Sequence, residues 1–329
     1  MSAGVRVPGR FCSVRNEVLT ESLGFEWEGL SLIGDLCIPD SGGQHPVVVM
    51  IQGSGPADRT GNGYFPPIRD AFLARGIATF AFDKPGCGES DGCWRDYALE
   101  SRADQVVTAI ETVREQDIID GGLVGLWRQS QGGWLVQMPA SRLPDLRFAI
   151  ANSGPSISLP DQDLYGCEHS MRAQGPKEAE IEKALHFVFE IHEVPRDDID
   201  YNTFNDQLFS PARTESWYGY MTIDDAQDWQ LICSFVNEQY EPVEALRRIR
   251  CSFLAVYGGR DVLVPAWQCA SESGQALQQA INPDATIVVF PDGDHRIRKA
   301  GTLEFADGYV DLLATWTAHR TSSSPQTTR

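Results

Sequence analysis

Ser130 lies between a short apolar run and two glycines, in the sequence Trp127-Arg128-Gln129-Ser130-Gln131-Gly132-Gly133. The apolar run at 123–127 is typical of a buried strand, and the apolar residues from Trp134 onward have the spacing of a helix. A serine in a tight turn between a strand and a helix is the pattern of a nucleophile elbow, whose strained backbone projects the hydroxyl group into a pocket. The sequence therefore predicts that Ser130 is a nucleophile.

Arg128 departs from the usual form of this motif, G-x-S-x-G, because it stands where the first glycine is expected. The positions two before and two after the serine are small, since the strand and the helix approach closely there. Three interpretations of Arg128 stay open: a carboxylate neutralises it in a structural role, it binds an anionic group of the substrate, or it disables ordinary hydrolysis. We favour an active enzyme that tolerates the departure.

A serine hydroxyl is a weak nucleophile that needs a general base, and the base needs an acid that orients it. The strand predicted at 253–257 ends in Gly258-Gly259-Arg260-Asp261, and the strand at 286–290 is followed by Pro291-Asp292-Gly293-Asp294-His295. Nucleophile, acid and base thus follow one another as Ser130, Asp261 and His295, each after a predicted strand.

Each of these residues alone has a simpler explanation. Serine is a good helix N-cap, aspartate is a common turn residue, and a single histidine is more often structural than catalytic. Asp292 and Asp294 beside His295 form an ordinary turn, and no second histidine lies at ligand spacing, so no metal is expected. The occurrence of a nucleophile, an acid and a base in this order, each after a predicted strand, favours a catalytic triad.

Strands and helices alternate along most of the chain. Residues 11–40 have the alternation of antiparallel strands with a turn near 21–24. Parallel strands are predicted at 47–51, 77–82, 123–127, 148–151, 253–257 and 286–290, and helices at 67–75, 98–115, 134–138, 266–280 and 303–319. This order predicts an α/β fold with a mostly parallel central sheet flanked by helices.

The alternation stops near residue 153 and resumes near 249, with helices predicted at 178–191 and 226–239 between them. We therefore expect a core in two parts, 1–154 and 246–319, with a helical cap inserted at 155–245. The Ser/Thr/Pro-rich tail at 320–329 is expected to be disordered.

The composition narrows the choice of partners. With 27 Lys and Arg against 46 Asp and Glu, the net charge is −19, which repels phosphate backbones and anionic membranes. Neither a membrane-spanning run nor the apolar segment of a signal peptide is found, so a cytoplasmic protein is expected. The eight scattered cysteines indicate neither a disulfide framework nor a zinc site. A homo-oligomer stays open.

Together these segments resemble the α/β-hydrolase superfamily, over about 25–155 and 240–318. The segments Gly53-Ser54-Gly55-Pro56-Ala57-Asp58-Arg59 and 82–90 resemble its bacterial esterase and prolyl-oligopeptidase-like branch, where a histidine usually stands in place of Gln52. The resemblance implies an α/β-hydrolase fold, carboxylic ester, thioester or amide substrates, and no cofactor.

The resemblance also suggests binding residues. The backbone N–H groups of Ser54 and Gln131 are expected to form the oxyanion hole. Gln52, Arg128 and the cap segment Trp217-Tyr218-Gly219-Tyr220 are candidates for substrate contacts, although the cap aromatics could equally well pack the cap against the core.

The function expected from the sequence is that of a serine hydrolase acting through an acyl-enzyme on a small acyl substrate. Two alternatives stay open. The same triad could run acyl transfer, C–C cleavage or cyclisation, or Arg128 and Gln52 could mark a catalytically impaired binding protein.

Overall fold

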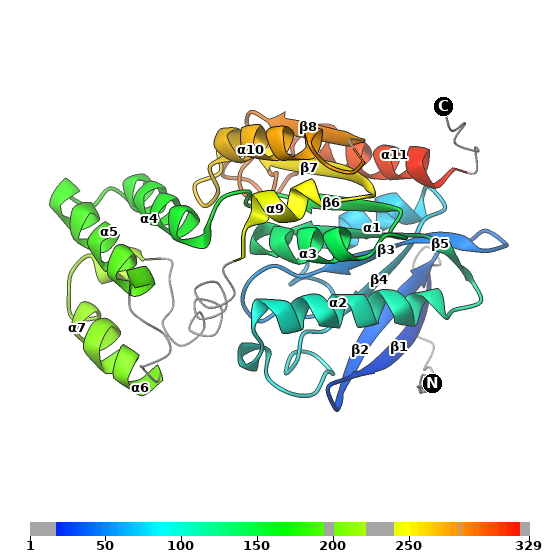
Figure 1. Cartoon of the computed structure of the whole chain (residues 1–329), viewed down its shortest axis with the longest axis horizontal. Helices are drawn as coiled ribbons and strands as arrows, with labels where there is room; N and C mark the ends of the chain where they lie inside the picture. The colour runs from blue at the N-terminus through cyan, green and yellow to red at the C-terminus, as the bar shows by residue number, and fades with distance from the viewer. Residues whose placement is uncertain (1–17, 194–200, 222–239, 283, 323–329) are drawn as a thin grey trace.

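The computed structural model describes residues 18–193, 201–221, 240–282 and 284–322. Its eight strands form one sheet in the order β1-β2-β4-β3-β5-β6-β7-β8. β2 is antiparallel to both β1 and β4, and the pairs from β4 to β8 are parallel. Helices cover the sheet on both sides (Figure 1), which confirms the predicted fold class.

The strands are β1 Leu19–Trp27, β2 Leu30–Ile38, β3 His45–Ile51, β4 Ala78–Phe82, β5 Ile119–Gln129, β6 Phe148–Asn152, β7 Ser252–Gly258 and β8 Ala285–Phe290. The helices that flank the sheet are α1 Pro66–Leu73, α2 Leu99–Arg114, α3 Trp134–Arg142, α9 Pro242–Arg247, α10 Ala266–Gln278 and α11 Tyr309–Thr321. A 3₁₀ turn, η1, spans Trp94–Asp96.

The two faces of the sheet carry separate apolar cores. In β3, Val47 and Val49 pack in the core that α2, α3 and α10 cover, whereas Val48 and Met50 pack in the core that α1 and α11 cover. Successive side chains of a strand point to opposite faces, so a strand buried on both faces is a continuous apolar run. This is why the central strands could be recognised in the sequence.

The turn between the first two strands lies at Glu28 and Gly29, so the prediction of a turn near 21–24 was wrong. Both residues have positive φ, 48° for Glu28 and 80° for Gly29, as in the two-residue hairpin turns whose twist matches that of paired strands. Residues 21–24 instead continue β1, with Leu23 opposite Gly34.

The last helix begins later and ends later than predicted. Residues 303–308 are not helical, with Phe305 in an isolated β-bridge to Arg298, and Gly308 has a φ of 82° directly before α11, which a helix cannot continue through. The helix then extends to Thr321, so the first two residues of the expected disordered tail are helical, while 323–329 lie outside the described residues.

Between β6 and β7 the chain leaves the sheet and forms a group of helices beside one end of it (Figure 1). These are α4 Leu159–Gln174, α5 Glu178–Glu193, α6 Tyr201–Phe204, η3 Asn205–Phe209, α7 Ser210–Ala212 and η4 Tyr218–Tyr220. They share an apolar core of their own, which includes Met171, Phe187 and Phe209. The helix predicted at 226–239 lies outside the described residues, and the domain boundaries at 155 and 245 stay a prediction.

None of the helices described combines the length and the apolarity needed to cross a membrane.

Candidate active site

Ser130 directly follows β5 and has the strained backbone of an elbow. Its φ is 71°, in the left-handed region, which costs a residue other than glycine about 1–2 kcal/mol. A 3₁₀ turn over Ser130–Gly133 leads into α3. The chain therefore reverses direction sharply at the serine, and the strain at this residue is the kind that functional sites retain.

Three side chains from distant parts of the chain form a continuous series of hydrogen bonds. The Oγ atom of Ser130 lies 2.7 Å from Nε2 of His295, and Nδ1 of His295 lies 2.7 Å from Oδ2 of Asp261. The Asp261 side chain is almost completely buried and that of His295 is partly exposed. The structure thus brings together the three residues that the sequence predicted as a triad.

The Asp261 carboxylate is held in a fixed orientation. Its second oxygen, Oδ1, accepts hydrogen bonds from the backbone N–H groups of Leu263 at 2.8 Å and Val264 at 3.0 Å. These bonds leave Oδ2 for His295. The glycine before this turn is required by space, because a Cβ atom on Gly258 would lie 2.1 Å from the carbonyl oxygen of Asp294. The loops of the acid and the base are therefore in direct contact.

Two further contacts to the triad were not predicted from the sequence. The hydroxyl of Tyr165, in α4, donates to the carbonyl of Asp261 at 3.1 Å, and Nε2 of Gln129 donates to the carbonyl of His295 at 3.2 Å. Both act on backbone carbonyls and belong to no motif, although Gln129 adjoins the serine. They connect the inserted helices and β5 to the loops that hold the acid and the base.

The loop after β3 lies directly beside the serine. A Cβ atom on Gly53 would lie 3.5 Å from the Cβ of Ser130. The next residue, Ser54, is exposed, and among the described residues no group accepts its backbone N–H. Gln131 occupies the second residue of the 3₁₀ turn, where backbone N–H groups lack partners within the helix. Both predicted oxyanion donors are thus backbone groups next to Ser130.

Two cations hold the Gly53 carbonyl. Nζ of Lys84 donates to it at 2.5 Å and an Nη of Arg128 approaches it at 3.4 Å. Since the C=O and N–H of a trans peptide point in opposite directions, fixing this carbonyl also fixes the direction of the Ser54 N–H.

Arg59 fixes the other end of the same loop. Its guanidinium contacts three carboxylates, those of Asp35 at 2.8 Å, Asp83 at 2.7 Å and Glu89 at 2.5 Å. Asp83 is completely buried and also accepts the backbone N–H groups of Arg59 and Glu89. Through Arg59, the loop at 53–59 is therefore bonded to β2 and to the turn after β4.

The Arg128 side chain does not leave the elbow for solvent, and within the described residues it meets no carboxylate of the kind that its structural interpretation requires. The Arg128 side chain is 2% exposed and lines a cavity. Its Nε and Nη1 atoms have no hydrogen-bond partner among the described residues. Burial lowers the pKa of both Arg128 and Lys84 well below the ordinary values, and the nearby charge of Arg102 lowers both further. The close approach that the motif requires occurs instead at Gly133, which contacts Gly154.

The remaining predicted binding residues lie in different surroundings. The Gln52 side chain is buried, donates to the carbonyls of Phe82 and Asp58, and lines the same cavity as Arg128. Trp217 packs in the core of the inserted helices, with its ring centre 5.3 Å from that of Phe187, and Tyr218 and Tyr220 border this core. Their role in substrate binding stays a prediction. No three metal-ligating side chains of the described residues lie close enough together to hold a metal ion.

Comparison with known proteins identifies the family. The model of the "Alpha/beta hydrolase family" matches residues 48–312, from within β3 into α11. The chain belongs to the alpha/beta hydrolase family. The matched region of this alpha/beta hydrolase contains Ser130, Asp261 and His295, and also the helices inserted between β6 and β7.

Curated proteins similar in sequence to this alpha/beta hydrolase include a bacterial and a mammalian protein. An uncharacterized 31.7 kDa protein of Escherichia coli is 24% identical over 261 residues, which cover 77% of this chain and 83% of the other. The mouse mitochondrial palmitoyl-protein thioesterase ABHD10 is 23% identical over 246 residues, which cover 73% of this chain and 67% of the other.

Solved structures share the fold of the alpha/beta hydrolase at low sequence identity. The Pyrococcus furiosus esterase PF2001 has a TM-score of 0.60 and 15% identity, with 96% of this chain and 95% of that chain covered. Est1E of Butyrivibrio proteoclasticus, with bound ferulic acid, has a TM-score of 0.57 and 16% identity, with 90% and 96% covered.

Proposed function

We propose that this alpha/beta hydrolase is a serine hydrolase that cleaves a carboxylic ester, thioester or amide through an acyl-enzyme on Ser130. The hydrogen-bonded series from Ser130 through His295 to Asp261 carries the proposal. It supplies a nucleophile, a base in contact with it and an acid that orients the base, which is the set of roles that acyl transfer to serine requires.

The proposed reaction begins when Nε2 of His295 takes the proton of Ser130 as Oγ attacks the acyl carbonyl. The resulting imidazolium is stabilised by the Asp261 carboxylate, which accepts hydrogen bonds from two backbone N–H groups and from the histidine. His295 then gives the proton to the leaving group. A water molecule attacks the acyl-enzyme in the same way, with His295 again as the base, and releases the carboxylic acid.

The negative charge that forms on the substrate oxygen needs preorganised donors. The backbone N–H groups of Ser54 and Gln131 are the proposed pair. The Gly53 carbonyl is held by Lys84, so the Ser54 N–H keeps its direction without reorganisation during the reaction.

Labelling with a fluorophosphonate tests the nucleophile. We expect a single covalent adduct on Ser130, identified by peptide mass, and neither an adduct nor turnover of 4-nitrophenyl esters in Ser130→Ala. Ser322→Ala, at a surface serine after α11, is the matched control and should keep both. An active, unlabelled Ser130→Ala protein would refute the proposal.

The class of acyl bond is tested by comparing turnover of matched ester, thioester and amide substrates with one acyl group. The name of the mouse relative, a palmitoyl-protein thioesterase, is the reason to include a palmitoyl thioester in this series. Mass analysis in ¹⁸O-labelled water separates hydrolysis from the non-hydrolytic alternatives, because hydrolysis places one labelled oxygen in the acid product. A product without label would favour transfer, cleavage of a C–C bond or cyclisation.

Arg128→Gly tests the alternative of a catalytically impaired protein. If Arg128 disables the elbow, restoring the glycine should raise ester turnover by orders of magnitude. We expect no such gain, because the distances between Ser130, His295 and Asp261 already suit proton transfer with Arg128 in place.

A further inference from the structure

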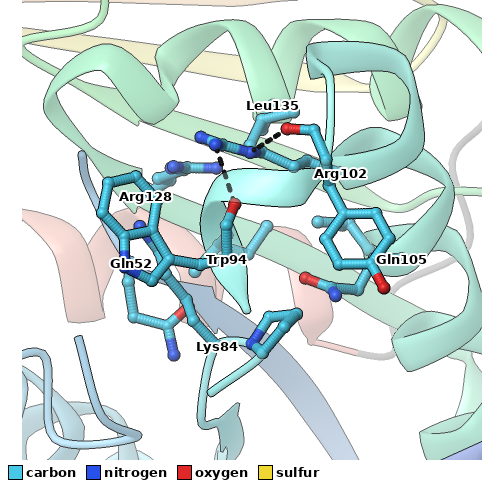
Figure 2. Close-up of a pocket in the computed structure, with 11 residues that line it drawn as sticks. Gln52, Lys84, Trp94, Arg102, Gln105, Arg128 and Leu135 are labelled. Carbon is cyan, nitrogen blue, oxygen red and sulfur yellow. Dashed lines mark hydrogen bonds between the residues drawn. The ribbon is translucent and has the colours of Figure 1, made fainter. Parts of the chain in front are cut away.

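A small cavity of about 20 Å³ lies behind the loop that follows β3, between that loop, α2 and the start of α3. Figure 2 shows the side chains around it, among them Gln52, Lys84, Arg102 and Arg128. Apolar side chains complete the wall, including those of Trp94 and Leu135. Three basic side chains therefore border one cavity in a protein whose net charge is −19.

The cavity wall contains no carboxylate to neutralise Lys84 or Arg128, as far as the chain is described. The carboxylate of Asp83, which directly precedes Lys84 in the chain, is bound by Arg59. Arg59 differs from Arg128 in the same protein, because this partly buried arginine has three carboxylate partners. Arg128 is more deeply buried than Arg59 and has none among the described residues.

The charge of Arg128 cannot be removed by deprotonation at physiological pH. Two of its three nitrogens, Nε and Nη1, have no partner within the described part of the chain, although the side chain is 2% exposed and lines the cavity. A buried charge without a counter-charge is strongly unfavourable, so a site of this kind calls for an anion.

We propose that this cavity binds the carboxylate group of a small organic anion. The site is built in advance of binding: Arg102 donates to the carbonyls of Tyr97 at 2.9 Å and Trp94 at 3.0 Å, and Lys84 donates to those of Gly53 and Gly55. The binding itself does not depend on the proposed hydrolase function.

Size and shape favour a carboxylate over a larger anion. A cavity of this volume has room for one or two water molecules, which is close to what a carboxylate group displaces and too little for a phosphate group with its shell of oxygens. The planar guanidinium of an arginine presents parallel N–H groups that match the two oxygens of a carboxylate. The apolar wall suits the carbon atoms next to that carboxylate.

The carboxylate can come from the substrate itself or from a separate small molecule. Gly53 connects the cavity with the proposed nucleophile, because its carbonyl is bonded by Lys84 while its α-carbon lies beside Ser130. An anion in the cavity thus contacts Lys84, and Lys84 bonds the peptide group whose N–H belongs to Ser54.

Formate, the smallest carboxylate, is the probe for binding. The melting temperature of the protein is measured against formate concentration at constant ionic strength, with the bulky HEPES anion as the balancing ion. We expect a saturable rise in the wild type and in Arg69→Gln, a control that removes a positive charge outside the cavity. We expect no rise in Arg128→Gln. A wild type that does not respond, or an Arg128→Gln protein that responds equally, overturns the proposal.

Arg102→Gln covers the case in which Arg128→Gln fails to fold. Loss of one charge-assisted hydrogen bond should weaken formate binding at least about tenfold in calorimetric titration. Unchanged affinity in this variant would count against the site. Ser130→Ala should bind formate like the wild type, so loss of esterase activity and loss of anion binding are observed separately.

Two esters distinguish the sources of the carboxylate. If it belongs to the substrate, Arg128→Gln lowers kcat/KM for a 4-nitrophenyl hemiester of a short dicarboxylic acid at least about tenfold more than for 4-nitrophenyl butyrate. If it belongs to a separate molecule, formate changes the turnover of the neutral butyrate ester in the wild type and not in Arg128→Gln. Either result supports the site.

Discussion

Gly133 and Gly154 are in direct backbone contact: a Cβ atom on Gly133 would lie 2.3 Å from the Cα of Gly154. Gly133 precedes α3 and Gly154 follows β6, so this contact brings the helix of the elbow against the end of the neighbouring strand. Gly133 has ordinary helical angles, φ −54° and ψ −37°. Space, and not backbone conformation, therefore requires glycine here.

Gly133→Ala should destabilise the protein and disturb the elbow. The added methyl group meets backbone atoms, which cannot rotate away, and overpacking of this kind costs about 1–3 kcal/mol or more. Urea denaturation measures the free energy of unfolding, and an ester assay measures the effect on Ser130. Gly219→Ala is the control, since a Cβ atom there meets nothing within 4 Å. Equal stability of the two variants would contradict the contact.

Asp261→Asn should reduce ester turnover by about 10⁴-fold with little loss of stability. The side-chain oxygen of asparagine can keep the bonds from the Leu263 and Val264 N–H groups, which turns its NH₂ toward Nδ1 of His295. His295 then carries its proton on Nε2 and cannot accept one from Ser130. Steady-state kinetics together with the urea midpoint tests this. A variant that keeps more than about a tenth of the activity would show that Asp261 does not orient the base.

Ser54→Pro and Ser54→Ala form a matched pair for the oxyanion loop. Proline removes the backbone N–H, whereas alanine removes only the exposed hydroxyl group. If the Ser54 N–H binds the oxyanion, kcat falls about 10²–10³-fold in the proline variant and stays near the wild-type value in the alanine variant. Similar kcat values for the two variants would exclude this N–H as a donor, provided that circular dichroism shows both are folded.

Arg59→Met should cost about 3–5 kcal/mol of unfolding free energy, because it leaves the buried carboxylate of Asp83 without its cation. Arg69→Met is the control, as the ion pair of Arg69 within the described residues is with the exposed Asp70 beside it. Denaturant titration of both variants measures the difference. A cost for Arg59→Met below about 1 kcal/mol, the usual value of an exposed ion pair, would refute a structural role for this cluster.

The triad could be predicted because each member follows a strong local signal. Ser130, Asp261 and His295 come after apolar runs that form β5, β7 and β8, and the carboxyl ends of parallel strands share one edge of a sheet. Residue order and strand pattern were therefore sufficient to place these three side chains near one another.

The first hairpin shows where the local pattern was ambiguous. The polar residues Glu21 and Ser22 and the nearby Gly24 interrupt the apolar alternation of β1 and resemble a turn, while the true turn, Glu28-Gly29, contains only one glycine as a signal. Register and twist of the paired strands decided the position of the turn, and these depend on β2 and β4 rather than on the turn sequence.

The position of the Arg128 side chain could not be predicted from the sequence, for a different reason. Its cavity is formed by Lys84, Trp94 and Arg102, which come from two segments of the chain outside the elbow. A motif describes residues close in sequence and carries no information about such a wall. The contact of Tyr165 with the carbonyl of Asp261 is likewise visible only after the inserted helices are placed.

The position of β8 has a consequence for how activity is lost. Among the described strands, β8 lies at one edge of the sheet and pairs with β7 alone, and all six of its side chains are partly exposed. Edge elements with few buried contacts open at lower free energy than the central strands. Since His295 follows β8, detachment of this single strand separates base from nucleophile while most of the molecule remains folded. Inactivation should therefore occur at a lower denaturant concentration than global unfolding, and reversibly, as a local event at one edge.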